Sequence, residues 1–189
     1  MRIPVSLMLL VLLSCRSKTA TESEMNFYLA DPDNGLRKTL VKEDVNLEIS
    51  YRPRELVFIR ESRKDQQPAT LDSMDYFMFR LSRNGKVIEH IYGADQAEYN
   101  RVISYLDGEL GNDIYLQRDG TIIYPAGVSL MPSVNTAGAS TIILVFKSAL
   151  RKYDGEFTIM FNDSMFGTGQ TDFEFNSRDI KRVPSLKII

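Results

Sequence analysis

The sequence predicts a mainly β protein, an antiparallel β-sandwich with one inserted α-helix. Short segments in which apolar and polar residues alternate recur along the chain. This period of two is typical of strands that bury one face. Turn-forming pairs such as Asn84-Gly85 and Asp119-Gly120 separate the segments, as expected for antiparallel hairpins. Residues 95–108 instead repeat their apolar positions with the period of a helix.

Three strands are predicted between residues 27 and 59. Residues 27–29 form a short apolar run before a dense turn cluster at 31–35. Apolar and polar residues alternate over 45–50, which indicates a half-buried strand. Residues 56–59 are continuously apolar, and such a run is compatible with a strand covered on both faces.

A hairpin is predicted next. Residues 77–82 alternate between apolar and polar side chains. The following Asn84-Gly85 pair is the strongest short hairpin signal, because both residues tolerate positive φ. We expect Val87 and Ile88 on the returning strand.

One segment interrupts the strands. A single helical face, at positions i, i+3, i+4 and i+7, is formed by Tyr99, Val102, Ile103 and Leu106. Asp95 is placed to cap the helix, with Glu98 completing a capping box. Gly108 is placed for the left-handed residue that ends many helices. We therefore predict a helix over 96–106.

Strands resume after the helix. Residues 114–116 and 121–124 flank the Asp119-Gly120 turn, and 141–146 is the best candidate for a central strand buried on both faces. Two final strands with alternating phenylalanines are expected at 157–161 and 173–175. About nine short strands, mostly in hairpins, favour a sandwich of immunoglobulin-like or transthyretin-like architecture.

Composition excludes several classes of protein. Hydrophobic residues make up 43% and charged residues 25% of the 189 residues, which is typical of a folded domain. The formal net charge of −2 does not favour nucleic-acid binding. The single cysteine excludes a disulfide within the chain and a zinc site built from cysteines.

The N-terminus has the features of an export signal. Arg2 precedes an apolar run over residues 3–13. Eleven helical residues span roughly 16 Å, about half of the hydrocarbon thickness of a bilayer. The run is therefore too short for a transmembrane helix and has the length of a signal-peptide core.

Leu12-Leu13-Ser14-Cys15 resembles the lipobox of bacterial lipoproteins. The resemblance covers about 15 residues and implies lipidation of the Cys15 thiol, cleavage after Ser14, and fatty acylation such as palmitate on the new amine. Arg16 rather than Asp follows the cysteine, so the enterobacterial sorting rule implies the outer membrane. We predict a signal peptide over 1–14, a lipidated cysteine with a polar tether over 15–25, and one β-sandwich domain over 26–189.

Residues suited to catalysis are few. His90 is the single histidine, and no Gly-x-Ser-x-Gly motif accompanies it. An ordinary surface histidine is the simpler interpretation. Asp72 and Asp75 could form a carboxylate pair of the kind that glycosidases use, but a chain with 25 acidic residues contains such pairs by chance. We predict a protein that is not an enzyme.

No cofactor or metal is predicted either. The Asp31 to Gly35 cluster fails the calcium-loop pattern, because position twelve is Lys42 rather than glutamate. Gly167-Thr168-Gly169 lacks the third glycine and the helix of a phosphate-binding loop. Plain turns account for both motifs.

Two further clusters are candidates for binding surfaces. The first is a basic cluster that contains Arg52, Arg54, Arg60, Arg63 and Lys64. Acidic residues interrupt it, so we predict a solvated face. An exposed aromatic patch for a partner could be drawn from Tyr76, Tyr92, Tyr99, Tyr105, Tyr115 and Tyr124.

These observations lead to a functional hypothesis. We expect a lipid-anchored, non-enzymatic accessory lipoprotein of the cell envelope that binds another envelope protein and no nucleic acid. The alternatives are an extracellular module that binds a glycan or another ligand, and a small hydrolase. An exposed apolar patch would favour the first, a concave aromatic face the second, and a cleft joining His90 to a serine and an acid the third.

Overall fold

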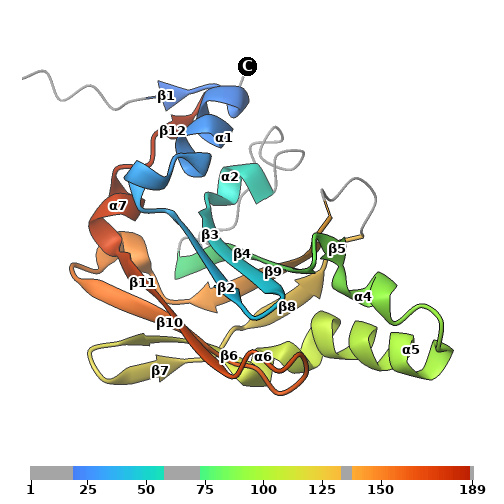
Figure 1. The fold of residues 1–189 in the computed structure, drawn as a ribbon. Coiled ribbons are helices and arrows are strands. Elements are labelled where there is room, and N and C mark those ends of the chain that lie inside the picture. The colour runs from blue at the N-terminus through green and yellow to red at the C-terminus, as the bar shows by residue number, and fades with distance from the viewer. Residues whose placement is uncertain (1–18, 58–72, 133–137, 188–189) are drawn as a thin grey trace, which may run out of the picture.

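The computed structural model describes residues 19–57, 73–132 and 138–187 (Figure 1). This part of the chain is mainly β, with antiparallel sheets packed as a sandwich. The larger sheet has the strand order β2-β3-β4-β9-β8, with β5 also paired to β4. Its strands are β2 (Arg37–Lys42), β3 (Val45–Arg52), β4 (Met74–Arg83), β5 (Lys86–Val87), β8 (Gly127–Leu130) and β9 (Ser140–Lys147).

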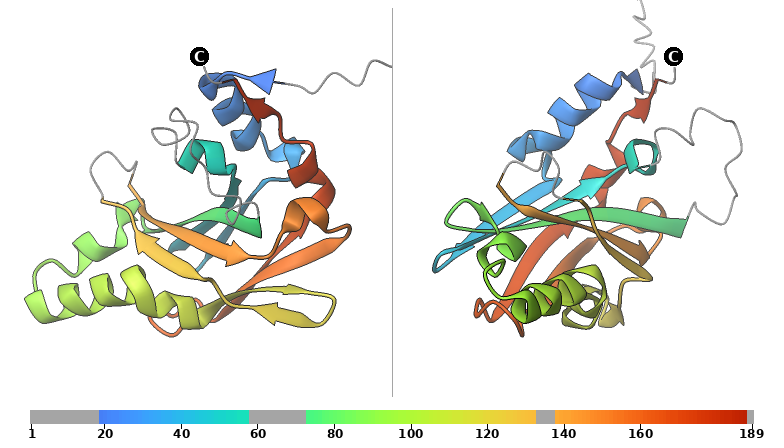
Figure 2. Two further views of the ribbon diagram at one scale, coloured as in Figure 1. Left: turned by 180° about the vertical axis from the view of Figure 1, so that it is seen from behind. Right: turned by 90° about the vertical axis from the view of Figure 1, so that its right-hand side faces the viewer.

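The smaller sheet has the order β11-β10-β6-β7 and is also antiparallel throughout. It consists of β6 (Ile114–Arg118), β7 (Thr121–Ile123), β10 (Glu156–Asn162) and β11 (Gln170–Asn176). A separate pair joins the two ends of the described chain: β1 (Thr19–Ala20) lies parallel to β12 (Ser185–Leu186). In Figures 1 and 2 this pair lies at one end of the sandwich, beside the first helix.

Phenylalanines from both sheets form the centre of the core. The ring of Phe77 on β4 lies 5.6 Å from that of Phe175 and 6.2 Å from that of Phe157, measured between centroids. The neighbouring Phe79 lies 5.1 Å from Phe161. Edge-to-face packing of this kind suits the quadrupoles of the rings. The core therefore forms because alternate positions of β4, β10 and β11 point inward from facing sheets.

Most of the predicted strands are confirmed. Those expected at 45–50, 77–82, 114–116, 121–124, 141–146, 157–161 and 173–175 correspond to β3, β4, β6, β7, β9, β10 and β11. Both hairpin turns also form, since Asn84, Gly85, Asp119 and Gly120 all adopt positive φ. Strand β9 is central as expected, although one of its faces is only partly covered at Ile143 and Val145.

The described chain has more helical segments than the single helix that the sequence predicted. The described chain contains α1 (Glu22–Ala30), α2 (Arg54–Val57), α4 (Ile88–Ile91), α5 (Gln96–Ser104), α6 (Leu110–Asp113) and α7 (Ser177–Lys181). It also contains 3₁₀ turns η1 (Pro32–Asn34) and η4 (Leu150–Lys152) and a π-helical segment η3 (Tyr105–Glu109). The predictions of strand at 27–29 and 56–57 are wrong, because these residues belong to α1 and α2, and Ile88 begins α4. Residues 58 and 59 lie outside the described chain.

Residues 19–25, the described part of the predicted polar tether, belong to β1, the N-cap of α1 and α1 itself. Thr19 and Ala20 form β1, and a capping box starts α1: the Thr21 hydroxyl accepts from the N–H of Glu24, whose carboxylate accepts from the N–H of Thr21 at 2.8 Å. Met25 and Leu29, one turn apart, are buried. Although the sequence of this segment is mostly polar, burial of these two side chains attaches it to the domain. The domain therefore starts before residue 26.

The helix predicted over 96–106 is present, but its end is not where Gly108 indicated. Asp95 caps α5 by accepting from the N–H of Ala97 at 2.8 Å, while Glu98 pairs with Arg101 at 2.9 Å. Gly108 lies inside η3, and helical structure continues to Asp113. The physical reason is burial, because Tyr105, Leu106 and Leu110 pack into the core and extend the helical segment past the glycine.

Candidate functional site

A hollow of about 240 Å³ lies between α1 and the outer face of the larger sheet. The described part of its lining combines three arginines with one carboxylate and a buried hydroxyl. The residues that line it are Asn26, Leu29, Ala30, Arg37, Glu48, Ser50, Arg52, Met78 and Arg80. We call this hollow the arginine pocket. It is smaller than the pockets of roughly 300–1,000 Å³ that hold drug-sized ligands, so it suits a small group.

Strand register explains why a hollow forms there. Alternate residues of β3 point to the outer face, and Ser50 stands between Glu48 and Arg52 on that strand. Across the sheet Ser50 is opposite Arg37 on β2 and Met78 on β4. A small serine surrounded by long side chains leaves a depression in the sheet surface. Helix α1, held in place by the buried Met25 and Leu29, forms the wall above it.

The charges in the arginine pocket do not balance. Glu48 pairs with Arg37 at 2.5 Å and with Arg80 at 3.5 Å. The Arg52 Nη1 atom donates instead to the Asn26 side-chain oxygen at 3.2 Å. Among the described residues of the lining, three guanidinium groups and one carboxylate leave an excess of two positive charges. The side chain of Glu48 is only 16% exposed, so solvent screens these charges less than at an open surface.

Hydrogen-bond donors also exceed acceptors in the arginine pocket. Each guanidinium carries five N–H donors and no acceptor, whereas Glu48 and Asn26 supply the acceptor oxygens described above. Within the described part of the chain, the buried Ser50 hydroxyl and the buried Arg37 Nε have no hydrogen-bond partner. Ser50 is 3% exposed. Buried polar groups of this kind are uncommon unless something else satisfies them.

The pKa of Arg52 reflects the same environment. Burial lowers it below the ordinary value for arginine, and the positive charges of Arg80 and Arg37 lower it further, while Glu48 acts in the opposite direction. An anion in the pocket would offset both unfavourable effects.

Among the described residues, His90 does not lie beside the serine and the carboxylate that a hydrolase would need. His90 is on α4, exposed, beside a surface hollow of about 570 Å³. The described lining of that hollow contains Arg83, Asn84, Lys86, Val87 and Ile91 but neither a serine nor a carboxylate. The adjacent Glu89 points into the interior, where it accepts from the Ser140 hydroxyl.

Asp75 is a buried structural carboxylate. Its Oδ2 atom accepts from the Ser148 hydroxyl at 2.7 Å and from the Leu150 N–H at 2.8 Å. Burial raises the pKa of Asp75, and the two hydrogen bonds partly oppose that effect. Asp72, its predicted partner in a carboxylate pair, lies outside the described residues.

Both glycine-containing motifs are turns. In the β10–β11 loop, which contains Gly167 and Gly169, the Asp163 carboxylate accepts from the N–H groups of Phe166 at 2.8 Å and Thr168 at 2.6 Å. At the other motif, Asp31 caps η1 and Gly35 ends it with positive φ. Across residues 19–57, 73–132 and 138–187 no cluster of three or more metal-ligating side chains occurs.

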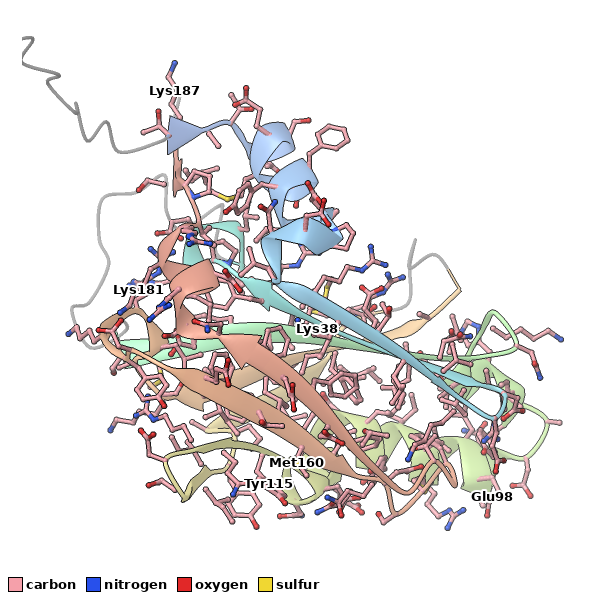
Figure 3. The ribbon with its side chains drawn as sticks, turned by 60° about the vertical axis from the view of Figure 1, so that its left-hand side comes forward. Lys38, Glu98, Tyr115, Met160, Lys181 and Lys187 are labelled. Atoms are coloured by element: carbon pink, nitrogen blue, oxygen red, sulfur yellow. The ribbon has the colours of Figure 1, made fainter. Side chains whose placement is uncertain are left out.

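A second surface lies on the outer face of the smaller sheet. The rings of Tyr115 and Tyr124 are 5.7 Å apart, and Met160 is opposite Tyr115 on the neighbouring strand. Figure 3 shows Tyr115 and Met160 close together on this face. Ile122 and Tyr124 are 50% and 56% exposed. We call these four residues the tyrosine face. Of the other predicted tyrosines, Tyr76 and Tyr105 are buried, and Tyr92 and Tyr99 are half-buried.

The described structure places Arg52 of the predicted basic cluster beside arginines from other strands. Arg52 joins Arg37 and Arg80, which lie far from it in the sequence, whereas Arg60, Arg63 and Lys64 lie outside the described residues. The sequence placed Glu48, Ser50 and Arg80 on the polar faces of their strands. It did not indicate which of these residues are neighbours, because that depends on the pairing of β2, β3 and β4. Cys15 also lies outside the described residues.

Comparison with protein-family models, with curated proteins and with solved structures gave no significant match. Among the helices of the described segments, none has the length and hydrophobicity needed to cross a membrane.

Proposed function

We propose that this chain is a lipid-anchored, non-enzymatic accessory protein of the cell envelope that binds an anionic group of another envelope component in the arginine pocket. The anchoring part rests on the lipobox-like Leu12-Leu13-Ser14-Cys15. The outer membrane is the proposed location, since Arg16 rather than Asp follows the cysteine. Helix α1, which forms one wall of the pocket, begins seven residues after Cys15.

The observation that carries the binding part is the excess of positive charge and of donors in the arginine pocket. The described residues of the lining include Arg37, Arg52, Arg80 and one carboxylate, and a buried serine hydroxyl has no partner among them. Charge-assisted hydrogen bonds from arginine to oxyanions are among the strongest in proteins. An anionic ligand would supply the missing acceptors.

The tyrosine face supports a protein partner as part of the same proposal. Tyrosine, methionine and isoleucine side chains that share one exposed sheet face are typical of the centre of a protein interface. A glycan is the alternative occupant, since the ring of Tyr124 is exposed beside that of the half-buried Tyr115.

Thermal unfolding of the full chain in detergent tests the anion-binding function. Because a ligand that binds only the native state stabilises it by mass action, the midpoint should rise by a few degrees in phosphate, and by less in acetate, relative to chloride at equal ionic strength. Arg52→Gln should abolish most of that rise. Arg101→Gln on α5, an equal loss of charge at an exposed position, should preserve it.

The matched variants matter because phosphate also stabilises proteins by exclusion from their surface. That effect would be the same in both variants. Equal midpoint shifts for wild type, Arg52→Gln and Arg101→Gln with every anion would refute anion binding at the arginine pocket.

A further inference from the structure

We infer that the ligand of the arginine pocket is a dianionic phosphoryl group, carried as a phosphate monoester. The inference rests on the proposed anion binding at this pocket and narrows it to one class of ligand. Inorganic phosphate shares the same chemistry.

Charge is the first argument. The excess of two positive charges in the lining is matched by a phosphate monoester, which carries about −1.5 to −2 at neutral pH. A carboxylate would neutralise only half of the excess. The pocket already contains one carboxylate, that of Glu48, and the arginines still outnumber it by two.

The arrangement of donors is the second argument. Arg37 approaches from β2, Arg52 from β3 and Arg80 from β4, and the Ser50 hydroxyl lies at the base between them. Donors that converge from several strands suit the three oxygens of a tetrahedral phosphoryl group. A planar carboxylate is instead matched by the fork of a single arginine.

Size is the third argument. The pocket of about 240 Å³ has room for a phosphoryl group and the first atoms of its ester, but it falls below the size of sites for larger cofactors. The Ala30 methyl group at its wall and the Ser50 side chain at its base are small, so the central space is left free.

Isothermal titration calorimetry of the detergent-solubilised full chain with glycerol 3-phosphate and, separately, with acetate tests the inference. A phosphate monoester has a second pKa near 6, so a site for the dianion should bind it about tenfold more tightly at pH 7 than at pH 5. Acetate, a carboxylate whose pKa lies just below 5, should bind weakly, and its affinity should change by less than about twofold over that range.

Two variants connect the binding to the pocket. Arg52→Gln should weaken glycerol 3-phosphate binding by about tenfold or more, as expected for a lost charge-assisted hydrogen bond. Ser50→Ala removes a hydroxyl that has no partner among the described residues, so it should leave the fold intact and still weaken binding. Arg101→Gln is the matched control and should bind like the wild type.

A third variant changes affinity in the opposite direction. Glu48→Gln raises the excess charge of the lining from two to three and should tighten glycerol 3-phosphate binding. Among the described residues of the lining, Glu48 is also the one carboxylate beside Arg37, Arg52 and Arg80. If the dependence on pH persists in Glu48→Gln, it comes from the ligand and supports the dianion.

The outcomes separate the two proposals. Acetate binding as tight as that of glycerol 3-phosphate, without the pH dependence, would overturn the phosphoryl inference and leave anion binding in place. Binding of neither ligand at the pocket would overturn both proposals.

The source of the phosphoryl group is distinguished by competition. If phosphatidylcholine vesicles that contain phosphatidic acid displace glycerol 3-phosphate, the group is a lipid headgroup. If pure phosphatidylcholine vesicles and the mixed vesicles both fail to displace it, the group belongs to a soluble ester. Either result retains the phosphoryl inference.

Discussion

At the scale of single residues, Asp75 and Ser50 illustrate two different uses of a buried polar group. Asp75 is satisfied by Ser148 and Leu150 and so fixes the chain after β9, where Ala149 adopts positive φ. Ser50 is equally buried but has no partner among the described residues. The first arrangement stabilises the fold, whereas the second leaves a donor available to a ligand.

The dependence of stability on pH tests the role of Asp75. Burial raises its pKa in the folded state, so its contribution is fully present below the unfolded-state pKa of about 3.9 and is lost as pH rises through the folded-state value. Urea unfolding between pH 4 and pH 8 should therefore show wild type losing stability relative to Asp75→Asn as pH increases. Parallel curves for the two proteins would contradict this assignment.

Asp75→Ala is the companion variant. It leaves the Ser148 hydroxyl and the Leu150 N–H without their acceptor, and an unsatisfied buried group costs about 1–3 kcal/mol. Asparagine can retain both hydrogen bonds, because both donors contact the same oxygen. At pH 7 we expect Asp75→Ala to be the less stable of the two variants.

At the scale of elements, the helical segment α5–η3–α6 shows how packing extends a helix beyond its sequence signals. Tyr105 on η3 donates to the Asp113 carboxylate at the end of α6, 2.7 Å away, and the Ser164 hydroxyl of the β10–β11 loop donates to the same oxygen. Asp107 accepts from the N–H of Leu130 on β8 at 2.8 Å. The segment is thus bonded to both sheets.

Two alanine substitutions test which face of this segment packs. Leu106 is fully buried, so Leu106→Ala should cost about 2–5 kcal/mol by leaving a cavity. The Arg101 side chain is 64% exposed and pairs with Glu98 at the surface. Arg101→Ala should change the free energy of unfolding by less than about 0.5 kcal/mol. Urea unfolding measures both, and equal losses would contradict the buried face.

At the scale of the whole molecule, the position of β1 limits how far the domain can lie from the proposed lipid anchor at Cys15. Three residues separate Cys15 from Thr19, and four extended residue steps reach roughly 14 Å at most. A tether to residue 25 would have allowed about 35 Å. If Cys15 is lipidated, the end of the domain formed by α1, β1 and β12 is therefore held near the headgroups.

Membrane fractionation tests the anchor. Cys15→Ala should abolish acyl labelling and release the protein from membranes, because the cysteine thiol is the attachment point for the acyl chains that hold it there. Ser17→Ala, two residues along, serves as the control and should remain labelled and membrane-bound. Undiminished labelling of Cys15→Ala would end the lipoprotein proposal.

The positions of most strands and of α5 were predictable from the sequence, because alternation of apolar residues and turn chemistry act over a few neighbours. The start of α1 was also signalled locally, by the Thr21-x-x-Glu24 capping pattern, although its weak apolar face favoured a tether. The arginine pocket was not predictable. Arg37, Ser50 and Arg80 become neighbours through the register of β2, β3 and β4, and register depends on the packing of both sheets rather than on any local segment.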